Sequence, residues 1–155
     1  MTTVTPFLWY DDDLEGALAL YASVLPDVVV EEASRSGPDP ASPLFSASFS
    51  IAGQRFVAIN GGPAHPHTDA FSIMVLCEDQ AEVDRYWDGL TAGDGEAGRC
   101  GWLKDPFGVS WQIVPRRLTE LLGDPDPEAA RRARDAMLAM DRLDIAALEA
   151  AHRGE

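Results

Sequence analysis

The pattern of apolar and polar positions predicts a strand–helix–strand–strand–strand order in the first 60 residues of the chain. Residues 4–10 are predicted to form a strand, and Asp11 to Asp13 then offer side-chain acceptors that can cap a helix. Apolar residues recur at helical spacing over residues 14–25, which predicts an amphipathic helix there. Three further strands are predicted over residues 28–33, 44–51 and 54–60.

The same order begins again after a Gly- and Pro-containing connection at residues 61–68. Residues 70–77 are predicted to form a strand and residues 79–90 a helix, and the Gly-rich stretch 93–98 has room for a reduced strand. A shift of 66 positions lays Asp13 on Asp79, and the apolar positions of the two helices then coincide. A repeat of this length and order indicates a duplicated module.

The second copy ends in a predicted hairpin over residues 100–115, whose two strands flank Asp105-Pro106-Phe107-Gly108. Pro presets φ for a turn and Gly supplies a positive φ, so this tetrapeptide is typical of a turn. Because side chains alternate along a strand, Gln112 is expected on one face and Trp111 on the other.

Residues 117–155 are predicted to form a helical C-terminal extension. Asp126 can cap one helix that has Pro127 at its first position, and Asp144 can cap a second helix. Predicted side-chain pairs in this extension are Glu128–Arg132, Arg131–Asp135 and the apolar pair Leu143–Leu148.

Composition restricts the possible partners. The chain of 155 residues has a formal net charge of −14, which argues against binding to a nucleic acid or to an anionic membrane surface. No apolar stretch approaches the length of a membrane span, and no secretory signal begins the chain. A cytoplasmic location with reduced Cys77 and Cys100 is therefore expected.

Common catalytic motifs are absent from the sequence. It holds no GxSxG elbow, no phosphate-binding loop of the GxxxxGK[ST] type and no HExxH. His65 and His67 can belong to a solvated loop, to the mouth of a binding site or to a weak chelating pair, and no third ligand is evident. Cys100 can be a plain thiol or a nucleophile that has no evident His partner.

Several separated segments together resemble the PhnB-like subfamily of the vicinal oxygen chelate (glyoxalase/bleomycin resistance/dioxygenase) superfamily, a subfamily often labelled demethylubiquinone methyltransferase-like. They are Thr5-Pro6-Phe7-Leu8-Trp9-Tyr10-Asp11, Asn60-Gly61-Gly62-Pro63, Gly101-Trp102-Leu103-Lys104-Asp105, Ser110-Trp111-Gln112-Ile113-Val114-Pro115 and, in the tail, residues 121–127 and 143–148.

The resemblance implies an α+β fold in which two βαβββ modules form an open, cup-shaped mixed sheet. On this basis residues 1–116 are expected to form one domain, with modules over about 4–62 and 68–116, followed by the helical extension 117–155. Members of the superfamily commonly pair, so a homodimer is expected as well.

In the metal-using members of the superfamily, four inward side chains hold one divalent ion. The positions that match in this sequence are Pro6, Val57, Ser72 and Gln112, with the register at Val57 left open. None of these four is a His, Asp or Glu, the residue types that such ions require. No metal and no other cofactor are therefore expected, and no Gly-rich strand-to-helix turn is present that would suit a methyl donor.

Alternation along the strands gives an expected wall of the cup that is neutral and mostly apolar, which suits an uncharged or weakly polar organic molecule. The predicted ligand-binding residues are Pro6, Leu8, Tyr10, Ser72, Met74, Ser110 and Gln112, with Leu76 and Val114 beside them. Phe7, Trp9 and Trp111 are expected in the core beneath the helices. For Trp102, the sequence does not decide between the cup face and the core face.

The resulting prediction is a protein that binds a small organic molecule without a catalytic metal, with the occurrence of catalysis left open. A metal-dependent lyase, isomerase or dioxygenase of the same superfamily is one alternative. A scaffold or interaction protein that acts through the C-terminal helices is another, based on their amphipathic pattern.

Overall fold

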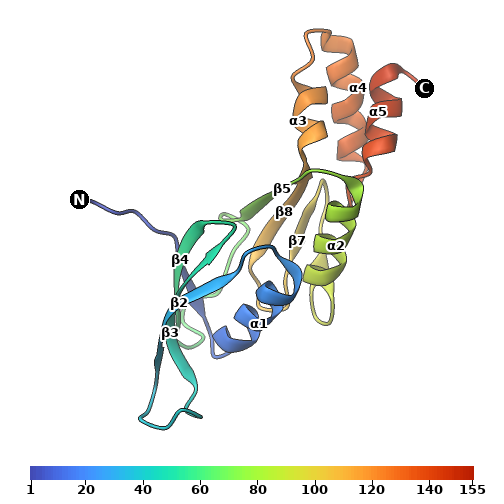
Figure 1. The fold of residues 1–155 in the computed structure, drawn as a ribbon. Helices are drawn as coiled ribbons and strands as arrows, with labels where there is room; N and C mark the ends of the chain where they lie inside the picture. Colours follow the sequence, from blue (N-terminus) through green and yellow to red (C-terminus); the bar gives the residue numbers. More distant parts are fainter. The chain divides into compact units, whose positions relative to one another are not determined.

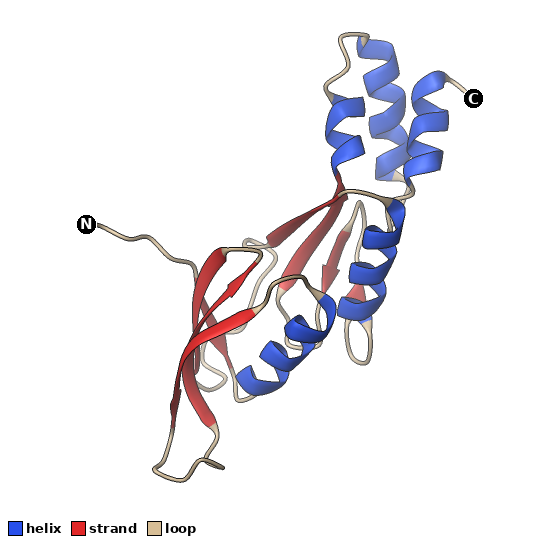
Figure 2. Ribbon diagram, in the orientation of Figure 1, coloured by secondary structure: helices blue, strands red, loops and turns tan.

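The computed structural model describes residues 1–155, and the chain in it divides into two compact units, Met1–His67 and Thr68–Glu155. Each unit contains an open four-stranded mixed sheet, and helices complete an α+β architecture (Figures 1 and 2). The predicted fold class is confirmed. None of the helices is long and apolar enough to cross a membrane.

The first unit has the predicted strand–helix–strand–strand–strand order. Its elements are β1 (Phe7–Tyr10), α1 (Leu14–Val24), β2 (Val29–Arg35), β3 (Leu44–Ile51) and β4 (Gln54–Asn60). The strand order in the sheet is β1-β4-β3-β2, in which β1 runs parallel to β4 and the other pairs are antiparallel. The tight turn between β3 and β4 has Ala52 and Gly53 at positive φ, the conformation that a two-residue hairpin turn requires.

Helix α1 covers one face of this sheet because its apolar residues lie on one side. Leu14, Ala17 and Tyr21 are fully buried, and Phe49 and Phe56 stack beneath them with ring centroids 5.4 Å apart. At the start of the helix, the side chain of Asp13 accepts from Gly16 N at 3.0 Å. This is the predicted N-cap.

Asn60, the last residue of β4, fixes the start of the same helix. Its Oδ1 accepts from Leu14 N at 2.9 Å, and its Nδ2 donates to the carbonyl oxygen of Leu44 at 2.7 Å. This one side chain thus accepts from a backbone N–H in the first turn of α1, which has no partner within the helix. It also links the end of β4 to the start of β3. Asn60 has a structural role in this position.

The second unit repeats the order and continues into the helical tail. Its sheet and helix are β5 (Ile73–Cys77), α2 (Gln80–Thr91), β6 (Glu96–Ala97), β7 (Trp102–Lys104) and β8 (Ser110–Pro115), with the strand order β5-β8-β7-β6. The reduced strand predicted in the Gly-rich stretch is β6, and Asp79 caps α2 by accepting from Glu82 N. Helix α2 lies against one face of this sheet (Figure 1).

The turn between β7 and β8 is organised by the buried carboxylate of Asp105. It accepts from Phe107 N at 2.9 Å, from Val109 N at 3.0 Å and from Trp111 Nε1 at 2.9 Å. Asp105 is 2% exposed, so these three donors replace the water that the carboxylate loses on burial. The predicted hairpin is therefore held by a side chain in its turn as well as by the Pro and Gly conformations.

The two modules differ by one residue in the connection from the first strand to the helix. Tyr10 and Cys77 end β1 and β5 and are 67 positions apart, whereas the helix caps Asp13 and Asp79 are 66 apart. A one-residue slip moves every side chain of a strand to the other face. A single shift of 66 therefore aligns the two helices correctly. It pairs each residue of β1 with a residue of β5 that points to the opposite face of its sheet.

The orientation predicted for β1 is wrong as a consequence. The Tyr10 hydroxyl lies 3.0 Å from the Tyr21 hydroxyl of α1, and Leu8, which shares its face, is 2% exposed in the core. Phe7, predicted to lie beneath the helix, is instead 56% exposed on the opposite face. Trp9 shares that face with Phe7 and is partly exposed.

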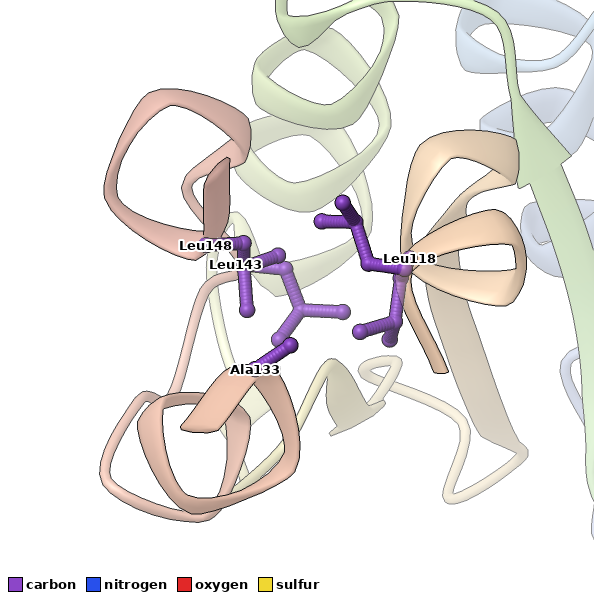
Figure 3. Packing of buried hydrophobic residues seen from close by; sticks show 5 residues of the cluster. Leu118, Ala133, Leu143 and Leu148 are labelled. Atoms are coloured by element: carbon purple, nitrogen blue, oxygen red, sulfur yellow. The ribbon is translucent and has the colours of Figure 1, made fainter. Parts of the chain in front are cut away.

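The tail consists of α3 (Arg116–Leu122), α4 (Pro127–Leu138) and α5 (Ile145–Arg153), packed side by side (Figure 2). Sequence analysis did not predict α3 as a separate helix. Its side chains meet those of α4 and α5 in one apolar cluster, of which Figure 3 shows four labelled members. The buried members are Leu118, Leu121, Ala133, Leu143 and Leu148.

The predicted caps of the tail are confirmed, since Asp126 accepts from Glu128 N and Asp144 accepts from Ala147 N. The predicted Arg131–Asp135 pair is present at 2.9 Å. The predicted Glu128–Arg132 pair is wrong, because Arg132 donates to the carbonyl oxygens at the end of α5.

Backbone hydrogen bonds attach this tail to the sheet of its own unit. Cys100 N donates to the carbonyl of Met140, and Gly101 N donates to that of Asp141, both at 2.8 Å. Gln80 at the start of α2 also donates to the carbonyl of Leu143 and accepts from Ile145 N. The tail is thus attached by backbone bonds to the segment before β7 and by the Gln80 side chain to α2.

Candidate functional site

The sheet of the second unit has one covered face and one open face. Trp111 and Ile113 of β8 are fully buried on the side of α2. Gln112 and Val114 point the other way, and on the neighbouring strand Met74 is 55% exposed on that same open face. This alternation is the one predicted for the last hairpin, and the placement of Trp111 in the core is confirmed.

Gln112 lies at the centre of a row of side chains that crosses three strands. It is opposite Met74 of β5 on one side and opposite Trp102 of β7 on the other. Its Nε2 donates to Ser72 Oγ at 2.8 Å. The amide oxygen of Gln112 has no protein donor, so it is available to accept a hydrogen bond from a molecule on this face.

A charged cluster lies on the same face, over β7 and β8. Asp69 Oδ1 accepts from Ser110 Oγ at 3.0 Å and lies 3.1 Å from Lys104 Nζ. The hydrogen bond from Lys104, followed by that from Ser110, lowers the pKa of the Asp69 carboxyl below its usual value. Asp69 therefore remains ionised and keeps Lys104 and Ser110 in place.

A pocket of about 190 Å³ opens beside this cluster. Its lining combines an indole ring, a carboxylate, an ammonium group and a hydroxyl in one depression. The lining residues are Asp69, Glu96, Ala97, Gly98, Trp102, Leu103, Lys104 and Ser110.

The structure brings four of the predicted ligand-binding residues together on this one face. They are Ser72, Met74, Ser110 and Gln112. It does not add Leu8 and Tyr10 to an open face, because both point toward α1. Pro6 precedes β1, and its carbonyl oxygen accepts from Val57 N at 3.0 Å. Ligand binding by any of these residues stays a prediction.

Sequence reasoning did not select Asp69 or Lys104 for this site. Lys104 has the same strand parity as Trp102, so alternation along the hairpin could have placed it on the open face. Asp69 lies in an irregular connection before β5, where no periodic pattern indicates which way a side chain points.

The donor set does not fit a divalent metal. Across the first and last strands of each module, the paired open-face positions are Phe7 with Val57 and Met74 with Gln112. Ser72 adds one hydroxyl, and none of these side chains is a His or a carboxylate. No group of three or more His, Cys, Asp or Glu side chains is arranged to hold a metal ion. An amide oxygen and a hydroxyl do not replace the water shell of such an ion.

The His65-Pro66-His67 segment packs against the aromatic end of β1. The His65 ring meets Trp9 edge-on with centroids 4.7 Å apart, and the His67 ring meets Tyr10 at 5.4 Å. Trp9 also donates from Nε1 to the carbonyl of Gly62 at 2.8 Å. The histidines thus form part of the packing around β1.

Trp9 explains why glycine follows Asn60. A Cβ on Gly61 would lie 2.1 Å from the Trp9 ring, so a side chain at this position cannot be accommodated without moving the indole. The Asn60-Gly61-Gly62 segment therefore supports the end of β1 and the start of α1.

The two cysteines differ in chemical character. Cys77 is fully buried at the end of β5, and burial, assisted by Glu82 and Asp79, raises the pKa of its thiol to about 12. A thiol with this pKa stays protonated at neutral pH and does not act as a nucleophile. Cys100 is partly exposed in the turn before β7.

The two βαβββ modules with open mixed sheets define the class as the glyoxalase-like fold. A family model described as 3-demethylubiquinone-9 3-methyltransferase matches residues 2–114. The chain therefore belongs to this family, the PhnB-like group of the vicinal oxygen chelate superfamily. The match ends before the three tail helices.

Solved structures agree with this assignment. A PhnB protein from Bacillus cereus, described as a putative 3-demethylubiquinone-9 3-methyltransferase, is 29% identical with a TM-score of 0.64, and the match covers 74% of this chain and 99% of that one. Protein PA1353 from Pseudomonas aeruginosa is 20% identical with a TM-score of 0.61, over 74% and 98% of the two chains.

The fosfomycin resistance protein FosX from Listeria monocytogenes shares the fold, with 15% identity, a TM-score of 0.54 and coverage of 74% of this chain and 93% of that one. A search of proteins with curated functions gave no significant match.

Proposed function

We propose that this protein binds a small, uncharged or weakly polar organic molecule on the open face of the β5-β8-β7-β6 sheet, without a catalytic metal. The observation that carries the proposal is the Gln112–Ser72 hydrogen bond of 2.8 Å on a face where Met74 remains largely exposed. Small-molecule sites combine apolar side chains with a few placed polar groups that orient the ligand, and this face offers both.

The side chains indicate which parts of a ligand this face would contact. The Gln112 amide oxygen would accept a hydrogen bond from a hydroxyl or N–H group of the ligand, because Nε2 is already engaged by Ser72. Met74, Val114 and the Trp102 ring would cover the apolar body of the molecule. Lys104 of β7, held by Asp69, would border the ligand on the β7 side.

A metal-dependent lyase, isomerase or dioxygenase is the alternative function. One structure of FosX is described as a complex with Mn(II), so the fold supports metal chemistry in that protein. The neutral open-face residues Val57 and Gln112 argue against a similar metal site here. Methyl transfer, which the family description names, lacks support in the residues because no Gly-rich strand-to-helix turn is present.

The remaining parts of the proposal concern assembly and location. We expect a homodimer in the cytoplasm, with residues 1–116 as the binding domain and 117–155 as an accessory helical extension. A scaffold role for the tail is less favoured, because its apolar face is used internally by Leu118, Leu143 and Leu148.

Native mass spectrometry on the purified protein tests the binding proposal. The wild-type chain is expected to retain a small organic adduct that Gln112→Leu loses. Gln54→Leu makes the same chemical change at an exposed position of β4 and should retain the adduct. A wild-type protein without adduct after exposure to a cell extract, or an adduct that Gln112→Leu keeps, would contradict the proposal.

A further inference from the structure

The open face of the first unit's sheet holds a pocket of about 290 Å³ whose polar side chains have no assigned role. The pocket lies over β2, β3 and β4, and all of its lining residues belong to the unit Met1–His67. Those that contribute side-chain groups are Glu32, Ser34, Ser46, Ser48, Arg55 and Val57.

Ser48 is the buried polar residue of this pocket. It is only 6% exposed, and its Oγ is buried without a hydrogen-bond partner. A buried hydroxyl that is left unpaired destabilises a fold, because the water that it loses on burial is not replaced. Buried polar groups normally have a hydrogen-bond partner, so an unpaired hydroxyl on a residue that lines a pocket is a candidate contact for a bound molecule.

Neighbouring strands surround Ser48 with further unpaired polar groups. Glu32 is opposite Ser48, and Ser34 is opposite Ser46 one step along the same strands. Side chains directly opposite each other on one face are about 4.5–5.5 Å apart at Cβ, which one small molecule can span. None of Glu32, Ser34 and Ser46 makes a side-chain hydrogen bond or ion pair within the chain.

The charges in the pocket favour a cation. Arg55 is already paired through its Nε with Glu31 at 2.8 Å, which leaves the Glu32 carboxylate as the uncompensated charge. The chain as a whole carries a net charge of −14, and this field also attracts cations. Three hydroxyls beside one carboxylate match a molecule that carries hydroxyl groups and one ammonium group.

We propose that the pocket over β2, β3 and β4 binds a small hydroxylated amine in its protonated form. The ammonium group pairs with Glu32, and a ligand hydroxyl completes the hydrogen bonding of Ser48 Oγ. All lining residues of this pocket belong to the first unit, whereas Gln112 belongs to the second.

D-Glucosamine is a suitable probe, and D-glucose is a neutral control of nearly the same size. In slightly acidic buffer, glucosamine should shift the amide NMR signals of the Ser46–Ser48 segment in a saturable way, and glucose should bind at least tenfold more weakly. Glu32→Gln should remove this difference between the two compounds. Equal binding of both compounds to the wild-type protein, or no shift with glucosamine, would overturn the proposal.

Two alanine variants on β3 provide a matched pair. Ser48→Ala should weaken glucosamine binding by about five- to tenfold, because one hydrogen bond in a buried setting is lost. Ser50→Ala lies on the same face two residues along but outside the pocket lining, and should leave binding unchanged. Equal effects of the two variants would contradict the site.

The unliganded protein gives a second readout. Ser48→Ala removes a buried hydroxyl that has no partner, so its Tm should rise by about 2–4 °C, whereas that of Ser50→Ala should not change. A fall in Tm for Ser48→Ala would show that the hydroxyl is satisfied within the empty protein, and would overturn the inference.

Discussion

Gln112 in β8 donates a hydrogen bond of 2.8 Å to Ser72, which immediately precedes β5. This bond joins the last strand of the second module to its first strand at the level of the side chains. It orients the Gln112 amide, so that its Nε2 is engaged and its oxygen is left for another donor. An oriented neutral amide thus occupies one of the four positions that the family resemblance matched to metal ligands.

Replacement of Gln112 by Leu should weaken ligand binding and leave the free energy of unfolding within about 1 kcal/mol of the wild type. One partly exposed hydrogen bond is lost, and Ser72 can turn to water, so no buried charge is left without a partner. Urea unfolding together with native mass spectrometry measures both quantities. A stability loss well above this value would mean that Gln112 is mainly a structural residue.

Replacement of the adjacent Trp111 by Ala should lower the free energy of unfolding by about 3–5 kcal/mol. The indole is fully buried, and its Nε1 is one of the three donors to the buried carboxylate of Asp105. Trp111→Phe keeps most of the volume and should cost less. If Trp111→Ala proved milder than Gln112→Leu in the same urea titration, the assignment of the two sheet faces would be wrong.

The two cysteines should react differently with a thiol reagent such as DTNB. In the folded protein only Cys100 is expected to react, because Cys77 is buried and the pKa of its thiol is raised to about 12. Both should react after unfolding in guanidinium. Two rapidly reacting thiols in the native protein would contradict the burial of Cys77.

The raised pKa of Cys77 also predicts a loss of stability in alkali. The unfolded thiol ionises near its ordinary pKa of 9.0, whereas the folded thiol remains protonated up to about 12. Stability is therefore retained below pH 9 and declines as the pH rises from there toward 12. Cys77→Ala should show a smaller decline over this range, and urea unfolding at several pH values would measure it. Equal slopes for the two proteins would contradict the prediction.

The purified protein should contain no stoichiometric transition metal. Phe7, Val57, Met74 and Gln112 occupy the paired open-face positions, and none of them offers the nitrogen or carboxylate donors that Zn, Fe, Mn or Ni sites use. Elemental analysis gives the metal content per chain. About one metal ion per chain that disappears in Gln112→Ala would overturn the prediction.

The protein should be a homodimer in solution. Phe7, Val29 and Phe45 are exposed apolar residues at separate places on the first unit, and exposed apolar side chains can be covered by a second copy of the chain. Light scattering at micromolar concentration determines the mass. A mass of 16.8 kDa, that of a single chain, would contradict the expectation.

Sequence patterns were sufficient for the last hairpin because its two faces differ in composition. Trp111 and Ile113 alternate with Gln112, so the buried and open faces are distinguishable from the residues alone. β3 and β4 were also predicted with the bounds that the structure has, since a tight turn at Ala52-Gly53 separates two clear strand patterns.

The first strand could not be oriented in the same way. Phe7-Leu8-Trp9-Tyr10 is apolar at every position, so alternation gives no information about which residues face α1. The repeat does not orient the strand either, because the shift of 66 aligns the helices and the connection from β1 to α1 is one residue longer than that from β5 to α2. Helix α3 was missed for a related reason, because it follows β8 without a loop or a capping side chain.

The extra residue between β1 and α1 has a consequence for how a duplicated module can diverge. The face that a strand presents to its helix depends on the length of the link between them, and β1 is apolar enough to tolerate either face. Insertion or deletion of a single codon in such a link would exchange one complete set of exposed side chains for the other. New binding surfaces can therefore arise after gene duplication without any substitution in the strand itself.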